Sequence, residues 1–184
     1  MPAALIASML KIAFSAQSAH ATDPALVLSG LNHALRGKFQ GRYVTAAYAL
    51  IDTEKQTLRY AGAGHPPLLL REASGTIRRV LENGLFLGYF PHATYATVET
   101  PFREGDRILL YTDGIPEMAD SSQEQFGEPR LREFLENHPD GSASHLADSL
   151  LDHLFRWSGR AAGEAPDDDV TLLAVHFRGS ERPG

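Results

Sequence analysis

The sequence has no cysteine among its 184 residues, which excludes disulfides, thiolate metal ligands and a cysteine nucleophile. It also has little positive charge, because 17 lysines and arginines against 23 acidic residues leave a formal charge of −6. The basic residues are scattered along the chain, whereas a nucleic-acid footprint needs a clustered basic face. The composition therefore predicts no nucleic-acid partner.

Long hydrophobic runs are missing as well. No apolar stretch approaches the roughly 20 residues that a membrane-spanning helix needs, and the sequence predicts a cytoplasmic protein without membrane contact. Residues 1–21 are apolar and end in small residues, which admits a secretory signal as an alternative. A signal begins with a positive stretch, but the first charge here is Lys11, inside the apolar segment. We therefore interpret Pro2 to about Gln17 as a buried helix.

What is present is an ordinary globular composition, 43% hydrophobic and 22% charged. The length fits one domain with a core of its own. We expect residues 1–179 to form that domain and residues 180–184 to be a disordered tail.

Helix and strand signals follow one another in blocks. Asp23-Pro24 is a strong helix start, a capping side chain followed by proline at the first helical position. The periodicity predicts helices at 2–17, 24–36, 128–137 and 144–157, and strands at 43–50, 58–61, 68–71, 76–81, 95–100, 107–111 and 170–177. Because the strands form a block between pairs of helices, we expect α+β layers rather than a parallel βαβ sheet.

Carboxylates at the ends of strands are the most informative residues. Asp113-Gly114 follows the apolar strand 107–111, and Asp167-Asp168-Asp169 directly precedes the last strand. Adjacent carboxylates repel one another and lower strand propensity, so a divalent cation that prefers oxygen ligands, such as Mg²⁺ or Mn²⁺, would stabilise the run. The residues alone leave a second interpretation open, in which the acidic run is a solvated turn.

Other candidate residues are weaker. His65 lies in the rigid glycine- and proline-rich segment 61–67, where a structural role in the turn is favoured over contact with a substrate. Glu117, four residues after Asp113, is either support for a metal ligand or an exposed acid. The eight histidines show no HExxH spacing, so the sequence does not point to a zinc hydrolase.

An ordered set of motifs resembles one protein family. The segments are Tyr-Val-Thr-Ala-Ala-Tyr at 43–48, Tyr-Ala-Gly-Ala-Gly-His-Pro-Pro at 60–67, Leu-Gly at 87–88, Gly-Asp-Arg-Ile-Leu-Leu-Tyr-Thr-Asp-Gly-Ile-Pro-Glu at 105–117 and Asp-Asp-Val-Thr-Leu-Leu at 168–173. Together they closely resemble the sporulation and general-stress (SpoIIE-like) branch of the bacterial PPM-type (protein phosphatase 2C-like) serine/threonine phosphatases. The resemblance covers essentially the whole chain, and the ordered set is far more specific than any single motif.

The resemblance implies a fold, a cofactor and a site. The fold is α+β, a four-layer α-β-β-α sandwich of two mainly antiparallel sheets flanked by helices. The cofactor is a pair of Mn²⁺ or Mg²⁺ ions, for which Asp113 of the Thr-Asp-Gly motif and Asp168 of the Asp-Asp-Val-Thr motif are the implied catalytic metal ligands. Asp169 takes the neighbouring, non-coordinating place and Asp167 precedes the motif, although three aspartates in a row leave the register open by one residue.

One family motif has no counterpart in the sequence. The first signature, Asp-x-x-Gly-His-Gly, lies in the family immediately before a Pro-Ala-Ala-Leu helix start, and residues 2–5 match that start. The aspartate of this signature bridges the two metals in the family. We therefore expect either a domain truncated at its N-terminus or one that has lost catalysis, with little or no activity in the chain as it stands.

The implied function is metal-dependent hydrolysis of phosphoserine or phosphothreonine on a signalling protein, by family analogy an anti-sigma-factor antagonist. Water attacks directly and no phosphoenzyme forms, in agreement with the lack of cysteine. The resemblance also implies an upstream sensor or receiver domain in the full-length protein and leaves a homodimer open. Two alternatives stand beside it: a catalytically inactive phosphatase-fold module that binds a signalling partner, and an unrelated α+β binding domain.

Overall fold

The computed structural model describes residues 3–38, 43–138, 141–160 and 164–178, so the predicted tail at 180–184 lies outside the described residues. Contacts divide the chain into two compact units. Unit 1 comprises Met1–Pro67 and Val80–Phe102, and unit 2 comprises Leu68–Arg79 and Arg103–Gly184. No helix within the described ranges has the length and apolar character that crossing a membrane requires.

Unit 1 is built on the predicted hairpin. Strands β1 (Ala46–Asp52) and β2 (Thr57–Ala63) pair antiparallel along their whole length, from Ala46 opposite Ala63 to Asp52 opposite Thr57. The turn between them is closed by the Asp52 carboxylate, which accepts the backbone N–H groups of Glu54 and Lys55 at 3.1 and 2.9 Å. This is the local side-chain-to-backbone bonding that makes aspartate favourable in turns. The hairpin starts at Ala46 rather than at 43 because β2 ends at its partner, Ala63.

The second edge of β2 is shared by two short strands. β6 (Val98–Pro101) pairs antiparallel with the first half of β2, up to Tyr60 opposite Val98. β5 (Asn83–Gly84) pairs parallel with the second half, at Gly62 and Ala63. The strand expected at 95–100 therefore begins at Val98, because β5 occupies the edge of β2 beyond Tyr60. β5 itself was not predicted, since two residues carry no periodicity.

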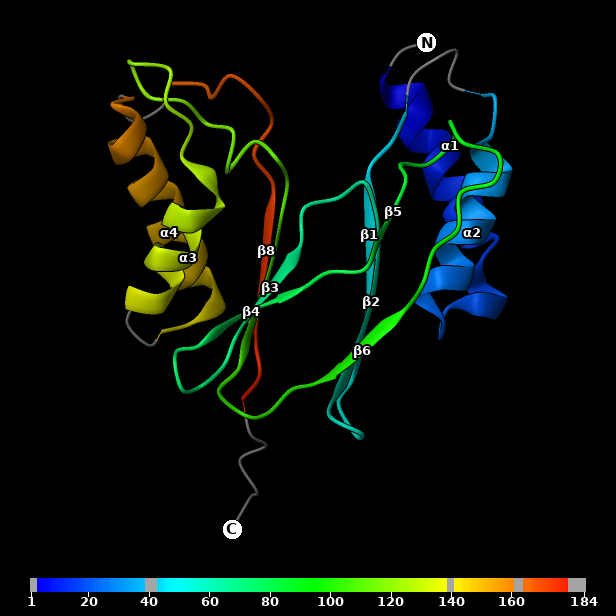
Figure 1. Ribbon diagram of the computed structural model, residues 1–184, viewed down its shortest axis with the longest axis horizontal. Helices are drawn as coiled ribbons and strands as arrows, with labels where there is room; N and C mark the ends of the chain where they lie inside the picture. The colour runs from blue at the N-terminus through cyan, green and yellow to red at the C-terminus, as the bar shows by residue number, and fades with distance from the viewer. Residues whose placement is uncertain (1–2, 39–42, 139–140, 161–163, 179–184) are drawn as a thin grey trace. The chain divides into compact units, whose positions relative to one another are not determined.

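Two helices cover this sheet (Figure 1). α2 (Pro24–Leu35) begins as predicted, with the Asp23 carboxylate accepting the N–H groups of Ala25 and Leu26 at 3.0 and 3.3 Å. Its inward face joins the core of unit 1, whose buried members are Ala13, Val27, Leu28, Leu31, Leu35, Ala61, Ala63 and Leu87. A short 3₁₀ turn, Ser18–His20, connects it to the preceding helix.

The interpretation of the first helix as buried is wrong. α1 (Ala3–Ser15) packs on the core of unit 1 through Ala13 and the partly buried Ile6, Met9 and Leu10. The other side of its apolar surface is exposed, with exposed fractions of 49% for Leu5, 72% for Ile12 and 49% for Phe14. An apolar stripe this wide needs neighbours on two sides, whereas α1 contacts α2 along one face.

Unit 2 carries the second sheet, in the order β4-β3-β7-β8. The strands are β3 (Leu68–Arg71), β4 (Ile77–Val80), β7 (Arg107–Tyr111) and β8 (Leu172–His176). β7 pairs antiparallel with β3 and with β8. β8 is shorter than the predicted 170–177, because it is paired only opposite the five residues of β7.

The helices of unit 2 are α3 (Gly127–Asn137) and α4 (Ala143–Ser158). They bury one face each in the core of this unit, which contains Leu69, Ile77, Leu109, Tyr111, Ile115, Met118, Phe126, Leu131, Leu135, Leu146, Leu150 and Leu154. The predicted α+β class is thereby confirmed: two mainly antiparallel sheets, each flanked by its own pair of helices.

Candidate functional site: an acidic rim beside β7 and β8

The register of β7 and β8 brings the two acidic motifs to one edge of the sheet. The last pair of the ladder is Tyr111 opposite Leu172. Because the strands are antiparallel, the exit of β7 lies next to the entry of β8. Asp113 follows the exit by two residues and Asp168 precedes the entry by four. Segments 55 positions apart in the sequence thus become neighbours. We call this edge, with Asp113 on one side and Asp167–Asp169 on the other, the acidic rim.

Thr112 extends the contact beyond the ladder. Its backbone N–H donates to the carbonyl of Thr171 at 3.0 Å, and its Oγ1 accepts the N–H of Thr171 at 3.0 Å. The hydroxyl also lies 3.2 Å from the carbonyl oxygen of Asp169, to which it can donate. A single threonine therefore connects the Asp113 motif to Asp169, the last member of the acidic run, and to Thr171, which follows it.

Gly114 allows the backbones to touch. A Cβ at this position would lie 2.5 Å from the carbonyl oxygen of Asp169, a distance that side-chain carbons do not adopt. Gly114 is buried, while the flanking Asp113 is exposed. The motif Thr-Asp-Gly thus requires glycine at this position because the Asp169 backbone lies too close for any side chain.

The three consecutive aspartates differ in their partners. Asp167 forms an ion pair with Arg160. Asp168 accepts the backbone N–H of Asp169 on its Oδ1 at 2.7 Å. All three residues are exposed. Part of the repulsion expected in this run is therefore offset within the chain, by one guanidinium and one backbone N–H.

On the other side of the rim, Asp113 begins a tight turn. Its carbonyl accepts the N–H of Glu117 at 2.9 Å, and the Glu117 side chain is exposed. Ile115, between them, is buried in the core of unit 2 and anchors the turn. This geometry leaves both interpretations of Glu117 open.

The donor chemistry of the rim fits a hard cation. Exposed carboxylate oxygens are the ligands that Mg²⁺ and Mn²⁺ prefer, and one or two carboxylates with water are usual for Mg²⁺. Within the described residues, no cluster of three or more histidine, cysteine, aspartate or glutamate side chains is arranged to hold a metal. The assignment of Asp113 and Asp168 as ligands stays a prediction, supported by the contact between their segments.

His65 belongs to unit 1 and occupies a turn. Its N–H donates to the side-chain oxygen of Asn83 at 3.3 Å, and the Asn83 amide donates to the carbonyl of His65 at 3.0 Å. The ring Nδ1 lies 2.9 Å from the carbonyl of Pro66, and Gly64 before it has a φ of +65°. These contacts agree with the structural role favoured from the sequence.

Sequence reasoning missed three contributors to the rim: Thr112, Arg160 and the steric role of Gly114. The first and third stand beside Asp113 in the motif, so their proximity was visible but their partners were not. Arg160 lies in a loop seven residues before Asp167, and no periodicity connects the two. Only the contact between their side chains shows that they pair.

Comparison with known proteins gives concordant results. The family described as Stage II sporulation protein E (SpoIIE) matches residues 1–178. Phosphoserine phosphatase RsbP of Bacillus subtilis is 31% identical over 175 residues, covering 92% of this chain and 41% of RsbP. Phosphoserine phosphatase RsbU of the same organism is 29% identical over 178 residues, covering 95% of this chain and 51% of RsbU. The chain thus spans about half or less of the length of these relatives.

A solved structure shows the same fold. The SiaA-PP2C domain of Pseudomonas aeruginosa superimposes with a TM-score of 0.75 at 22% identity, covering 92% of this chain and 66% of that one. The family match extends over both sheets and the acidic rim. The chain therefore belongs to the SpoIIE family and is a PP2C-like phosphatase domain of the RsbU, RsbP and SpoIIE type.

Proposed function

We propose that this domain hydrolyses phosphoserine or phosphothreonine on a signalling protein, in a metal-dependent reaction at the acidic rim. Asp113 and Asp168 are the proposed ligands of Mn²⁺ or Mg²⁺. One observation carries the proposal: Thr112 and Gly114 contact the Asp167–Thr171 segment, so the two aspartate motifs share one edge of the sheet.

The contacts within the acidic run favour Asp168 over its neighbours. Asp167 is occupied by Arg160, which balances its charge. The N–H of Asp169 fixes one oxygen of Asp168, so this carboxylate is oriented without being neutralised. A ligand held in one orientation loses less entropy when it binds a cation. Within the proposal, Thr112 and Gly114 act as positioning residues.

The reaction that we propose consumes one water. The water oxygen forms a bond to phosphorus, the bond to the serine or threonine oxygen breaks, and that oxygen leaves with a proton as the free hydroxyl. When bound, the divalent cations supply a water of lowered pKa and neutralise charge that develops on the phosphoryl group. The role of Asp113 and Asp168 would be to hold these cations at the rim, beside the end of β7 and the start of β8.

The substrate class is proposed from the relatives. RsbP and RsbU are named phosphoserine phosphatases, and the family resemblance points to a phosphorylated anti-sigma-factor antagonist as the protein that carries the phosphate. We place the reaction in the cytoplasm. A sensor or receiver domain that controls the phosphatase is proposed for the whole protein.

The activity of the chain by itself is proposed to be low. Two carboxylates fill a small part of the coordination shell that hard dications require, and a two-metal site needs more. This ligand count also supports the second candidate function, a regulatory module that binds a phosphorylated partner without turnover.

Hydrolysis of a phosphoserine protein with and without Mn²⁺ separates the two functions. We expect little turnover by the chain as it stands, and Mn²⁺-dependent turnover once the family signature Asp-x-x-Gly-His-Gly is joined ahead of Pro2. Asp113→Asn or Asp168→Asn should abolish that turnover, and Asp167→Asn should leave most of it. An extended, folded chain that binds the substrate without turnover would identify the regulatory module instead.

A further inference from the structure

Arg160 lies beside the acidic rim but takes no part in the proposed reaction itself. Its guanidinium forms the ion pair with Asp167 and donates a hydrogen bond to the carbonyl of Ala165 at 2.9 Å. A planar guanidinium has its donors in a fixed fork, so it can hold two partners in one geometry. The side chain of Arg160 therefore fixes both the backbone before the acidic run and the first carboxylate of that run.

The backbone of Arg160 is itself fixed by the end of α4. Gly159 has a φ of +73° and ends the helix, and its N–H donates to the carbonyl of Arg156 at 3.2 Å. The N–H of Arg160 donates to the carbonyl of Phe155 at 3.1 Å, which completes a Schellman-type helix end. Through Arg160 the acidic run is thus attached to a helix whose inward face is buried in the core of unit 2.

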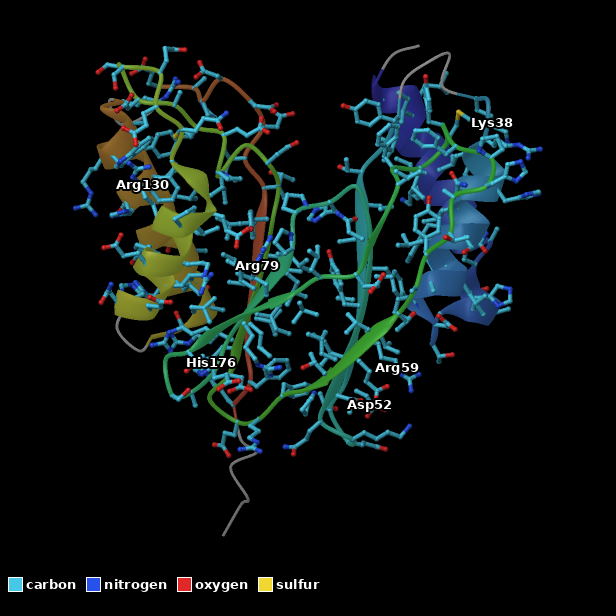
Figure 2. The ribbon with its side chains drawn as sticks, in the orientation of Figure 1. Lys38, Asp52, Arg59, Arg79, Arg130 and His176 are labelled. Carbon is cyan, nitrogen blue, oxygen red and sulfur yellow. The ribbon has the colours of Figure 1, made fainter. Side chains whose placement is uncertain are left out.

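The two partners of the ion pair differ in their exposure. The Arg160 side chain is 15% exposed, whereas the Asp167 side chain is 74% exposed. By comparison, the side chain of Arg79, which pairs with Glu128 at 2.9 Å, is 47% exposed (Figure 2). Arg160 is therefore packed in place, and the Asp167 carboxylate is the partner that can turn away into solvent.

Without Arg160, the Asp167 carboxylate would be a further candidate ligand at the rim. Residues 167 and 168 lie in a bend and not in a strand. The alternation that directs successive strand side chains to opposite faces therefore does not separate their carboxylates. Hard cations take several oxygen ligands, so a cation beside Asp168 would attract a second free carboxylate.

We propose that Arg160 is a positioning residue that holds the Asp167 carboxylate away from the cation and so keeps one coordination position open for water. The inference rests on the proposed role of Asp168 as a ligand. The proposed reaction needs an open position, because the divalent cations supply the attacking water. An additional carboxylate would fill that position and bind the cation more tightly.

Mn²⁺ binding to the natural chain and to Arg160→Gln tests this role. Loss of the free Mn²⁺ signal in an electron paramagnetic resonance titration gives the affinity, and the relaxation rate of water protons gives the number of waters on the bound ion. We expect Arg160→Gln to bind Mn²⁺ about tenfold more tightly and with fewer waters, because Asp167 becomes a ligand and a repelling charge is removed. Arg160→Lys, which keeps the positive charge, should restore the natural affinity.

Asp167→Asn separates ligation from an effect of charge alone. Added to Arg160→Gln, it should remove the gain in affinity and restore the natural number of bound waters. Arg79→Gln, which removes a charge from an exposed ion pair on β4, is the matched control. β4 and β8 are opposite edges of the sheet, three strand spacings or about 14 Å apart. Salt screens most of the charge effect over this distance, so Arg79→Gln should bind Mn²⁺ like the natural chain.

Two results would overturn the proposal: no gain in Mn²⁺ affinity in Arg160→Gln, or an equal gain when Asp167 is already asparagine. Asp168→Asn distinguishes this inference from the proposed function. If Asp168→Asn does not weaken binding, the proposed metal site fails and this inference with it. If it does weaken binding but Arg160→Gln gains nothing, only the role of Arg160 fails. The fold should be retained in these variants, because the end of α4 is held by backbone hydrogen bonds and not by the Arg160 side chain.

Discussion

A Cβ placed on Gly114 would lie 2.5 Å from the carbonyl oxygen of Asp169. The backbones of the two acidic motifs of this domain are therefore in direct contact, and this contact requires neither a side chain nor a cation. Thr112 stabilises the same contact by hydrogen bonds to Asp169 and Thr171. The rim is thus shaped by the fold itself, and a cation would bind to segments that are already adjacent.

Gly114→Ala tests this close contact. The added methyl group must displace the Asp169 backbone, so we expect a loss of about 1–3 kcal/mol in the free energy of unfolding, the usual cost of overpacking. Chemical denaturation measures it. Ser121→Ala, at an exposed position of the loop that follows, is the control and should change the free energy by less than about 0.5 kcal/mol. Equal stability of the two variants would contradict the contact.

Thr112→Val tests the hydroxyl bridge. Valine keeps the branched shape but removes the acceptor for the Thr171 N–H and the donor to the Asp169 carbonyl. We expect a loss of about 1 kcal/mol in the free energy of unfolding, because these groups lie near solvent and water replaces part of the bonding. Thr112→Ser keeps the hydroxyl and should preserve most of the stability. A serine variant as unstable as the valine variant would show that the methyl group, not the hydroxyl, matters.

The local patterns were sufficient to place the two acidic motifs at strand ends, whereas their position side by side was implied only by the family resemblance. Asp113 could be located because the apolar strand 107–111 stops just before it, and Asp168 because β8 begins after it. Their pairing depends on β7 and β8 being neighbours, which is a long-range contact that no local pattern encodes. Likewise, Arg160 and Asp167 pair although both lie outside the helices and strands, where no periodic pattern connects them.

Asp23→Ala tests the start of α2. The Asp23 carboxylate accepts two helix N–H groups and the hydroxyl of Thr97, the latter at 3.0 Å. Loss of such a cap costs about 0.5–2 kcal/mol. We expect Asp23→Ala to lower the free energy of unfolding by this amount in a denaturant titration, while Asp23→Asn, which keeps a capping oxygen, retains most of it. An unchanged alanine variant would mean that the cap contributes nothing.

The fold of unit 1 shows where sequence patterns stop being informative. The capped start of α2 was predictable because the signal is local to Asp23-Pro24. The exposure of Ile12 on α1 was not predictable, because an apolar stripe indicates that a helix surface is hydrophobic but does not indicate which part of that surface is covered by a neighbouring element. β5 escaped prediction for a related reason: its two residues are held by the free edge of β2, which is tertiary information.

The lowered pKa of His138 predicts that the stability of the folded chain depends on pH. Burial and the charges of His145, Arg107 and Arg71 lower its pKa in the folded state, so the unfolded chain binds the proton more readily. Stability should therefore be complete above the ordinary histidine pKa of about 6.5 and fall as the pH drops below it. Denaturation at a series of pH values should show a smaller fall in His138→Gln. His92→Gln, at an exposed histidine, is the control and should follow the natural chain. Identical pH profiles for all three proteins would refute the role of His138.

Mn²⁺ binding to the rim tests the central claim most directly. The loss of the free Mn²⁺ signal in an electron paramagnetic resonance titration measures binding without any need for turnover. We predict weak binding of one ion to the natural chain, lost in Asp113→Asn and in Asp168→Asn because hard cations require the charged oxygen. Asp167→Asn should change the affinity by less than about fivefold, since Asp167 is held by Arg160 in an exposed ion pair. Binding that survives both ligand substitutions, or that depends on Asp167 as strongly as on Asp168, would contradict the account.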